Sequence, residues 1–482
     1  MLEVITVKRL LAIIIATAFL IISLASCAKI VEGEGESGSD SNILNGSDSD
    51  VVGDNPSNNE NAATDEGNNN NNNNNNDDNN NTNNENNSGG DSGSTEKPTF
   101  NVKESTEGLK FVLNEDKLSY TVVGKGSATS KNIVIDGHNG LPVTKVGYSA
   151  FADDKNITSV KLGDYVEYID DYGFSMCSGI TSVTLGKNLK FLGDYSFRYC
   201  SALTAIELGK NVEVIKYGSF YNCGKLSSIK LGSNIRIIED YAFDKSAYYK
   251  DTANWKNKVL YIGTNLIEAK TDISGTYTIT SGTTCIAEMA FYDCKTFTGV
   301  VIPDSVHSID AKAFQHATSL KTITAGKGIT YIGELAFGNT KYYNTSTNWN
   351  NNVLYIGNYL VSAKPALSGS YTVSAGTKVI ADMAFSTCAS LSSIVIPDTV
   401  VYLGEYAFRG CEKLSSVTIG NGVKTIGVYA FKDCPALKNI TFKKASGWSA
   451  DGIAVSAEAL ADKSEAAVYL GMFYSGKVWK RA

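Results

Sequence analysis

The sequence has few of the residues that most enzymes and metal sites use. It contains three histidines, His138, His307 and His316, and none stands at metal-ligand spacing from another. Its nine cysteines include no Cys-x-x-Cys pair, so zinc sites and thioredoxin-like redox chemistry have no support. A nucleophile elbow and a phosphate-binding loop are also missing from the sequence. The pattern therefore indicates no enzyme and no cofactor, and no small-molecule substrate is evident.

Positive charge is scarce as well. The formal net charge is −7, and fifteen acidic residues fall within 28–97, against Lys29 and Lys97. The remainder of the chain is mildly basic, but it has no cluster of Lys and Arg and no basic strip with interleaved aromatics. We therefore expect no nucleic-acid partner.

A long apolar run occurs only near the start. Lys8 and Arg9 precede an apolar stretch from Leu10 to Leu24, which is too short to span a bilayer comfortably. The stretch ends in Leu24-Ala25-Ser26-Cys27, which resembles the lipobox of bacterial lipoproteins. The resemblance implies that 1–27 is a lipoprotein signal peptide and that Cys27 is the lipid attachment site, anchoring the protein to the membrane. The alternatives are an ordinary cleaved signal and an uncleaved anchor.

Residues 28–97 have low complexity. An unbroken asparagine run covers Asn68–Asn76, set among Asp, Ser, Gly and Glu. Almost nothing in this stretch can be buried, so the entropy cost of ordering it is not offset. The composition predicts a disordered acidic linker, and the alternative is a seed for β-aggregation.

A phenylalanine recurs at a fixed interval after this linker. The spacing is 23 residues within each of three groups and 48 residues between groups. The positions are Phe151, Phe174, Phe197, Phe220, Phe243, Phe291, Phe314, Phe337, Phe385, Phe408 and Phe431. A period in this range is typical of a solenoid.

Each unit has the same order of small, aromatic and aliphatic residues. In one copy these are Phe408, Cys411, Leu414, Val417 and Ile419, followed by Gly420. The spacing of three in the first part suits a short helical turn, and the spacing of two in the second part suits a strand. Stacked units would share one continuous core, because no unit can bury its apolar residues alone.

The pattern Gly-x-Tyr-Ala-Phe-x-x-Cys-x-x-Leu-x-Ser-Ile/Val-x-Leu/Ile-Gly/Pro resembles the BspA-like, treponemal-type class of leucine-rich repeats. The resemblance implies a right-handed solenoid with a stacked parallel sheet. It also implies a bacterial surface protein, since the family includes many, some of which bind host matrix proteins. We expect about thirteen coils, β-rich with short helical turns.

Segments that break the period set the expected boundaries. An N-terminal β cap covers 98–145, the repeats cover 146–444, and a helical C-terminal cap covers 445–482. Two variant coils, at about 247–283 and 341–377, match each other at an offset of 94 residues. We interpret each as a variant coil with an extra pair of strands, still within the stack.

Seven cysteines stand three residues after the repeat phenylalanine. Other coils place Asp154, Ser246, Ala317 or Thr340 there, which favours buried free thiols over disulfides or a metal array. Tyrosines two residues before the phenylalanine, such as Tyr172 and Tyr406, are either an aromatic ligand platform or, as we favour, a shield for the convex turn.

The solvent side of the predicted sheet is the candidate binding face. Its outward positions are Ser182, Thr184, Ser228, Lys230, Thr322, Thr324, Ser393, Ser416 and Thr418. We expect a protein-binding or adhesion scaffold in the cell envelope, lipid-anchored and exposed on the outer surface, whose partner is a host or microbial surface or matrix protein. The alternatives are a structural spacer without a ligand and a carbohydrate-binding surface protein.

Overall fold

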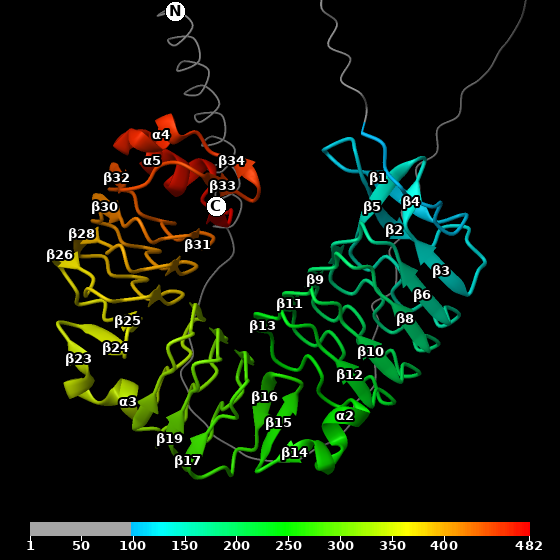
Figure 1. Cartoon of the computed structure of the whole chain (residues 1–482), viewed down its shortest axis with the longest axis horizontal. Coiled ribbons are helices and arrows are strands. Elements are labelled where there is room, and N and C mark those ends of the chain that lie inside the picture. The colour runs from blue at the N-terminus through cyan, green and yellow to red at the C-terminus, as the bar shows by residue number, and fades with distance from the viewer. Residues whose placement is uncertain (1–97) are drawn as a thin grey trace, which may run out of the picture. The chain divides into compact units, whose positions relative to one another are not determined.

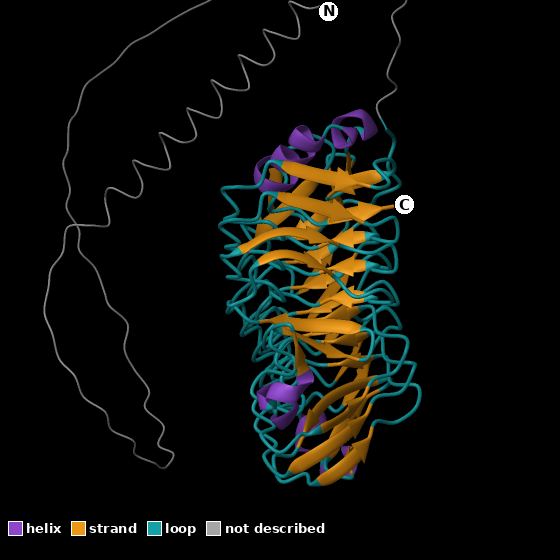
Figure 2. Cartoon of the chain, turned by 90° about the vertical axis from the view of Figure 1, so that its left-hand side faces the viewer, coloured by secondary structure: helices purple, strands orange, loops and turns teal. Residues whose placement is uncertain are grey.

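The structure is a computed structural model, and it describes residues 98–482. The expected signal peptide, the lipid attachment at Cys27 and the linker 28–97 lie outside the described residues. The described residues belong to one unit, Gly93–Ala482. They form a β-solenoid of about 14 turns, close to the thirteen predicted, and the turns follow an arc (Figure 1). Strands run across the stack, one above another (Figure 2).

One row of strands lies on the outer side of the arc (Figure 1). These strands are rich in Val, Ile and Thr, which suit a pleated, half-buried surface. The outer strands are β3 (Asn132–Ile135), β6 (Ser159–Leu162), β8 (Ser182–Thr184), β10 (Ala205–Glu207), β12 (Ser228–Lys230), β17 (Gly275–Thr278), β19 (Phe297–Val301), β21 (Thr322–Thr324), β26 (Gly369–Thr372), β28 (Leu391–Val395), β30 (Ser416–Ile419) and β32 (Asn439–Phe442). They pair in parallel and fall into four separate sheets.

A second row, mostly of two-residue strands, lines the inner, concave side (Figure 1). The inner strands are β5 (Leu141–Val146), β7 (Tyr168–Ile169), β9 (Phe191–Leu192), β11 (Val214–Ile215), β13 (Ile237–Ile238), β16 (Asn265–Ala269), β18 (Cys285–Ile286), β20 (Ser308–Ile309), β22 (Tyr331–Ile332), β25 (Tyr359–Ala363), β27 (Val379–Ile380), β29 (Tyr402–Leu403) and β31 (Thr425–Ile426). Within the regular coils, paired residues are 23 apart, as in Val214 opposite Ile237. The predicted period is therefore one turn of the solenoid.

The repeat phenylalanines stack between the two rows. Within each of the three groups, ring centroids of successive coils lie 5.0–5.5 Å apart and the ring planes are within 12° of parallel. All eleven side chains are buried. The predicted inward ladder is confirmed, and neighbouring coils rather than distant segments create the core.

The segment around each phenylalanine is a series of turns rather than a helix. The expected three-residue spacing does produce bonds of the i to i+3 kind, such as Cys177 N–H to Phe174 O at 3.3 Å. However, Tyr172 and Met176 have positive φ angles of 58° and 61°, which end the right-handed run after each turn. Their N–H groups instead donate to carbonyls of the next coil.

Two inserts interrupt the regular coils at matching places. The first contains α2 (Ala247–Lys250), η1 (Thr252–Asn254), β14 (Trp255–Lys256) and β15 (Val259–Ile262), and the second contains α3 (Lys341–Asn344), η2 (Ser346–Asn348), β23 (Trp349–Asn350) and β24 (Val353–Ile356). Ser246 and Thr340 replace the repeat cysteine here, and each side chain caps its helix by accepting from the backbone N–H of Tyr249 or Tyr343. Two of the four exceptions in the cysteine ladder thus have a structural cause.

The inserts also bend the solenoid. Each adds a hairpin on the outer side, whereas the inner strands on either side of it come together (Figure 1). Glu288 N–H donates to Ile238 O at 2.9 Å across the first insert, and Asp382 N–H donates to Ile332 O at 3.0 Å across the second. Because the hairpins lengthen the outer side while the inner strands stay hydrogen-bonded, the stack curves and its inner side is concave.

Both ends of the stack are covered. At the N-terminal end β1 (Lys110–Leu113) and β2 (Tyr120–Gly124) form an antiparallel hairpin, and β4 (Gly137–His138) pairs with β5. The C-terminal end carries β33 (Trp448–Ala450), β34 (Ile453–Ala454), α4 (Ala457–Ala461), α5 (Lys463–Val468), the π-helical turn η3 (Tyr469–Phe473) and β35 (Trp479–Arg481). β35 runs antiparallel to β31, which stops further parallel stacking, and Leu470 is buried in the core. Every helix within residues 98–482 is too short or too polar to cross a bilayer.

Candidate binding groove

The inner strands leave a row of side chains facing the concave side. In each two-residue strand the second residue is Ile or Leu and is buried, whereas the first faces outward from the core and is half-buried or exposed in most coils. We call the first residues the groove row: Tyr168, Phe191, Val214, Ile237, Cys285, Ser308, Tyr331, Val379, Tyr402 and Thr425. Tyr168 is 43% exposed, and its ring lies 6.0 Å from that of Phe191. The concave face therefore presents aromatic and aliphatic surface to solvent.

The curvature closes this face into a groove with two clefts. The cleft lined by Asp310 and Asp382, which we call the lower cleft, has a volume of about 690 Å³. The cleft lined by His307 and Tyr402, which we call the upper cleft, has a volume of about 670 Å³. Arg236, Ile237, Tyr331, Glu405 and Val478 line both. Residues from before the first insert thus face residues from after the second, which only the bending at the inserts makes possible.

Charged pairs follow the rim of the groove from coil to coil. Lys145 pairs with Asp170 at 2.6 Å, and Lys190 pairs with Glu167 at 2.9 Å. Each pair joins neighbouring coils because a side chain lies beside its equivalent one coil further along. Pairs this exposed contribute little stability, so their main effect is on the potential at the groove.

Two buried aspartates lie deeper in the groove. Asp382 is 8% exposed and accepts hydrogen bonds from Tyr331 Oη at 2.8 Å and Tyr402 Oη at 3.0 Å, and burial raises its pKa to about 7. Asp310 is 1% exposed, and its Oδ2 accepts from Ile238 N–H at 2.7 Å. Asp310 Oδ1 has no hydrogen-bond partner, and burial raises the pKa of this carboxyl well above its usual range.

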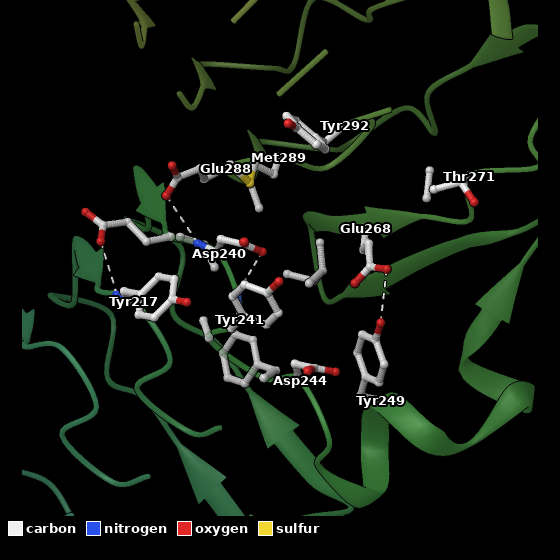
Figure 3. Close-up of a pocket in the computed structure, with 17 residues that line it drawn as sticks. Tyr217, Asp240, Tyr241, Asp244, Tyr249, Glu268, Thr271, Glu288, Met289 and Tyr292 are labelled. Carbon is white, nitrogen blue, oxygen red and sulfur yellow. Dashed lines mark hydrogen bonds between the residues drawn. The ribbon is translucent and has the colours of Figure 1, made fainter. Parts of the chain in front are cut away.

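A third cavity opens beside the lower cleft, where the first insert leaves the stack (Figure 3). This first-insert pocket has a volume of about 560 Å³ and shares Tyr217, Glu239, Asp240, Glu288 and Met289 with the lower cleft. Its wall also includes Tyr241, Asp244, Tyr249, Glu268 and Tyr292 (Figure 3). Tyr249 Oη donates to Glu268 at 3.0 Å, and burial raises the pKa of Glu268 and brings that of Asp240 to about 6.

The tyrosines two residues before the phenylalanine flank the groove instead of the convex turn. Tyr172 and Tyr195 stack with centroids 5.3 Å apart, and Tyr406 and Tyr429 stack at 5.2 Å. Tyr406 lines the lower cleft. The expectation that they shield the convex side is therefore wrong, because each stands three residues after a short inner strand, as Tyr172 does after β7 and Tyr406 after β29.

The candidate binding face expected from the sequence lies on the outer side of the arc. Its residues sit on β8, β12, β21, β28 and β30, and most of their side chains are exposed. The structure distributes them over four separate sheets and places none of them in the groove clefts: Ser182, Thr184, Ser228, Lys230, Thr322, Thr324, Ser393, Ser416 and Thr418. Lys230 pairs with Glu207 of the neighbouring coil.

The groove row was missed at the sequence level although its signal was present. Eight of the ten stand 17 positions after a repeat phenylalanine, the exceptions being Cys285 and Val379, and all ten come directly before the buried aliphatic residue. Tyr168, Phe191 and Tyr331 are aromatic, but a period alone does not tell which face becomes concave. That depends on the inserts, whose effect on curvature a linear sequence does not display.

The repeat cysteines are packing residues. The eight cysteines of the described region are free thiols, and Cys200 Sγ donates to Phe174 O of the preceding coil at 3.2 Å. Burial raises the pKa of the Cys177 thiol to about 12. Such thiols are weak nucleophiles at neutral pH. In residues 98–482 no group of three His, Cys, Asp or Glu side chains could hold a metal ion.

Similarity to solved structures is extensive but low in identity. A leucine-rich cell surface protein of Faecalibacterium prausnitzii is 22% identical, covering 71% of this chain and 94% of its own, with a TM-score of 0.27. A leucine-rich repeat protein of T. pallidum is 17% identical over 50% and 89% of the two chains, also with a TM-score of 0.27. The pneumococcal vaccine antigen PcpA is 16% identical over 72% and 82%, with a TM-score of 0.25. No curated protein matches the sequence.

A family model gives the decisive match. The model of the BspA type leucine-rich repeat region matches residues 131–250, 284–371 and 378–448 in six copies. These segments make up more than half of the chain and coincide with the stacked coils. The chain therefore belongs to the BspA-type leucine-rich repeat family.

Proposed function

We propose that this protein is a bacterial cell-surface lipoprotein that binds a protein partner in its concave groove and so acts as an adhesion scaffold. The observation that carries the proposal is the groove row, in which aromatic and aliphatic side chains remain partly exposed along several coils. Exposed apolar surface of this kind, rimmed by charges, is typical of interaction sites. The groove acts by contact and not by catalysis.

The chemistry of the groove fits an extended polypeptide. Successive rungs of a parallel stack lie about 4.8 Å apart, so the groove row repeats at a distance that side chains of an extended segment can follow. Tyr168, Phe191, Val214 and Ile237 provide a continuous apolar strip. We propose a host or microbial surface or matrix protein as the partner.

The surface location is supported by the lipobox-like sequence ending at Cys27 and by the solved relative that is described as a cell surface protein. In the proposal, acyl chains on Cys27 hold the protein in the envelope, and the linker 28–97 carries the solenoid outward. The Cys27→Ser variant should move from the membrane fraction to the medium, and palmitate labelling should disappear. Unchanged fractionation and labelling would contradict lipid anchoring at this residue.

The binding surface is tested by paired variants of one coil. Phe191→Glu places a charge in the groove row, and Ser182→Glu places the same charge on the outer face of the same coil. Cells that display each full-length variant are probed with arrays of extracellular proteins and of glycans. We expect protein binding that Phe191→Glu abolishes and Ser182→Glu retains.

Other outcomes point to other functions. Loss of binding only in Ser182→Glu would assign the site to the outer face. Signals on glycans alone would indicate a carbohydrate-binding protein, and silence on both arrays would favour a structural spacer.

A further inference from the structure

The two inserts offer an internal comparison that isolates one site. They have the same strands and helices at an offset of 94 residues, and each forms a pocket against the following coil. The eleven residues around the second-insert pocket all have counterparts in the wall of the first, including Tyr343 for Tyr249 and Met383 for Met289. Yet the first-insert pocket has about 560 Å³ and the second about 40 Å³.

The walls of the two pockets also differ in their side chains. At four matched positions the first insert carries an acidic or phenolic group where the second carries a small or apolar one. The pairs are Glu239 and Gly333, Tyr241 and Leu335, Asp244 and Gly338, and Glu268 and Ser362. The first pocket is thus the larger of the two and carries more acidic and phenolic groups, whereas the wall of the second has one carboxyl, Asp382, and one phenol, Tyr343.

The first-insert pocket has more negative than positive charge, although Lys270 of the chain lies beside it, with Nζ 5.4 Å from the centroid of the Tyr249 ring. Glu239 is paired with Lys216, and Glu288 lies 3.4 Å from Lys312 Nζ. Asp240, Asp244 and Glu268 make no ion pair with any residue of the described chain. Burial disfavours the ionised forms of Asp240 and Glu268, and a cation entering the pocket would offset that cost.

Aromatic rings surround these carboxylates. Tyr241, Tyr249 and Tyr292 line the cavity, and Figure 3 shows them around the same space as Asp244 and Glu268. Tyrosine faces attract ammonium and guanidinium groups, and the attraction grows as water is excluded. Rings and carboxylates together suit an organic cation better than a metal ion.

The adjoining cleft supplies an independent indication. Asp310 lines the lower cleft, is 1% exposed, and has an Oδ1 atom without a hydrogen-bond partner. Leaving a buried polar atom unpaired is unfavourable, and a ligand can remove that cost. A polar group of a ligand that extends from the pocket into this cleft would provide the missing hydrogen bond.

We propose that the first-insert pocket and the lower cleft beside it bind a segment of a protein partner that carries lysine or arginine, with one cationic side chain in the pocket. This rests on the proposed protein-binding function and identifies the chemistry of the partner. The pocket lies next to the groove row, so a segment in the groove can place a side chain in the pocket. The second insert lacks this site.

The probe is fluorescently labelled decalysine, measured by anisotropy against the full chain purified in detergent at 150 mM salt. The test variant combines Asp244→Asn with Glu268→Gln. The charge control combines Glu115→Gln with Glu458→Gln, which removes the same charge from exposed positions elsewhere. Ser362→Ala controls for the equivalent position of the second insert.

We expect decalysine binding that weakens at least tenfold in the test variant and changes less than twofold in both controls. Equal weakening in the test variant and the charge control would show that only net charge matters and would overturn the proposal. Absence of decalysine binding would also overturn it, and it would leave the proposed function standing if the protein array still gives a signal that Phe191→Glu abolishes. Competition by spermidine as strong as that by unlabelled decalysine would assign the pocket to a small polyamine and refute the polypeptide.

Should the double variant fail to fold, Asp244→Asn alone is used. The Asp244 side chain accepts only from the N–H of Lys245 in its own turn, and the backbone bonds of Asp244 to Asn222 and Tyr241 do not depend on the side chain, so the replacement leaves the stack intact. At least a threefold loss of decalysine affinity is expected for this variant, and an unchanged affinity would count against the pocket.

Discussion

Removal of one ring from the phenylalanine stack is the most direct test of the architecture. Phe220 is 0% exposed, and its ring lies 5.4 Å from that of Phe197 and 5.5 Å from that of Phe243. Truncation of a buried phenylalanine to alanine costs about 3–5 kcal/mol in protein cores. We expect Phe220→Ala to fall in the upper half of this range. The coils above and below are fixed by their parallel strands and cannot close the cavity, and two ring contacts worth about 0.5–1.5 kcal/mol each are lost.

The assay is urea unfolding of the full chain, followed by circular dichroism and by tryptophan fluorescence. Two probes are needed because a linear array of coils can unfold in parts. Phe151→Ala is the internal comparison, because Phe151 has a stacked partner on one side only, Phe174 at 5.1 Å. Its cost should be smaller by about one ring contact, 0.5–1.5 kcal/mol. Lys225→Ala, at an exposed position, should be neutral. A loss below about 1 kcal/mol for Phe220→Ala would refute the account of the core.

Two further predictions concern single buried groups. The folded-state pKa of Asp382 is raised by burial from 3.8 to about 7, so the stability from this group is fully present below about pH 4 and is lost as the pH rises through about 7. The melting temperature should therefore fall between pH 5 and pH 8, and Asp382→Asn should flatten this dependence in scanning fluorimetry; an identical slope in the variant would contradict it. Cys200→Ala should cost about 1–2 kcal/mol, because it removes a buried side chain and its bond to Phe174 O. Mass spectrometry should find Cys200 unlabelled by iodoacetamide until the chain is unfolded, and labelling of the native protein would argue against a buried thiol.

The repeat could be read from the sequence because each coil meets only its neighbours. A residue such as Phe220 has the same surroundings as Phe197, one coil earlier, so a period in the sequence becomes a period in space. For this reason the spacing predicted the stack and the packing of the cysteines, and the family resemblance added the parallel sheet. The substitutions at Ser246 and Thr340 were visible too, but their cause, the helix caps of the inserts, required the structure.

The proposed binding surface could not be predicted from the repeat spacing in the same way. The outward-facing hydroxyl residues and the groove row both recur with the repeat, so the period alone does not tell which of the two rows is the better candidate for binding. What separates them is curvature, and curvature follows from the inserts, where Glu288 and Asp382 hold the inner strands together while hairpins widen the outer side. A sequence pattern records which residues point away from the core, but it does not record which of two faces will be hollow.

The inserts therefore connect the architecture to the proposed function. A uniform stack of 23-residue coils has the same surface at every rung, and it offers a partner no particular place to bind. The two inserts break that symmetry, because they bend the groove row into clefts and leave Asp310 and Asp382 at the points of bending. The first insert adds Asp244 and Glu268 to its pocket, and the second does not. A specific site thus arises where the repeat fails, and substitutions that alter binding should cluster at the inserts and at the coils next to them.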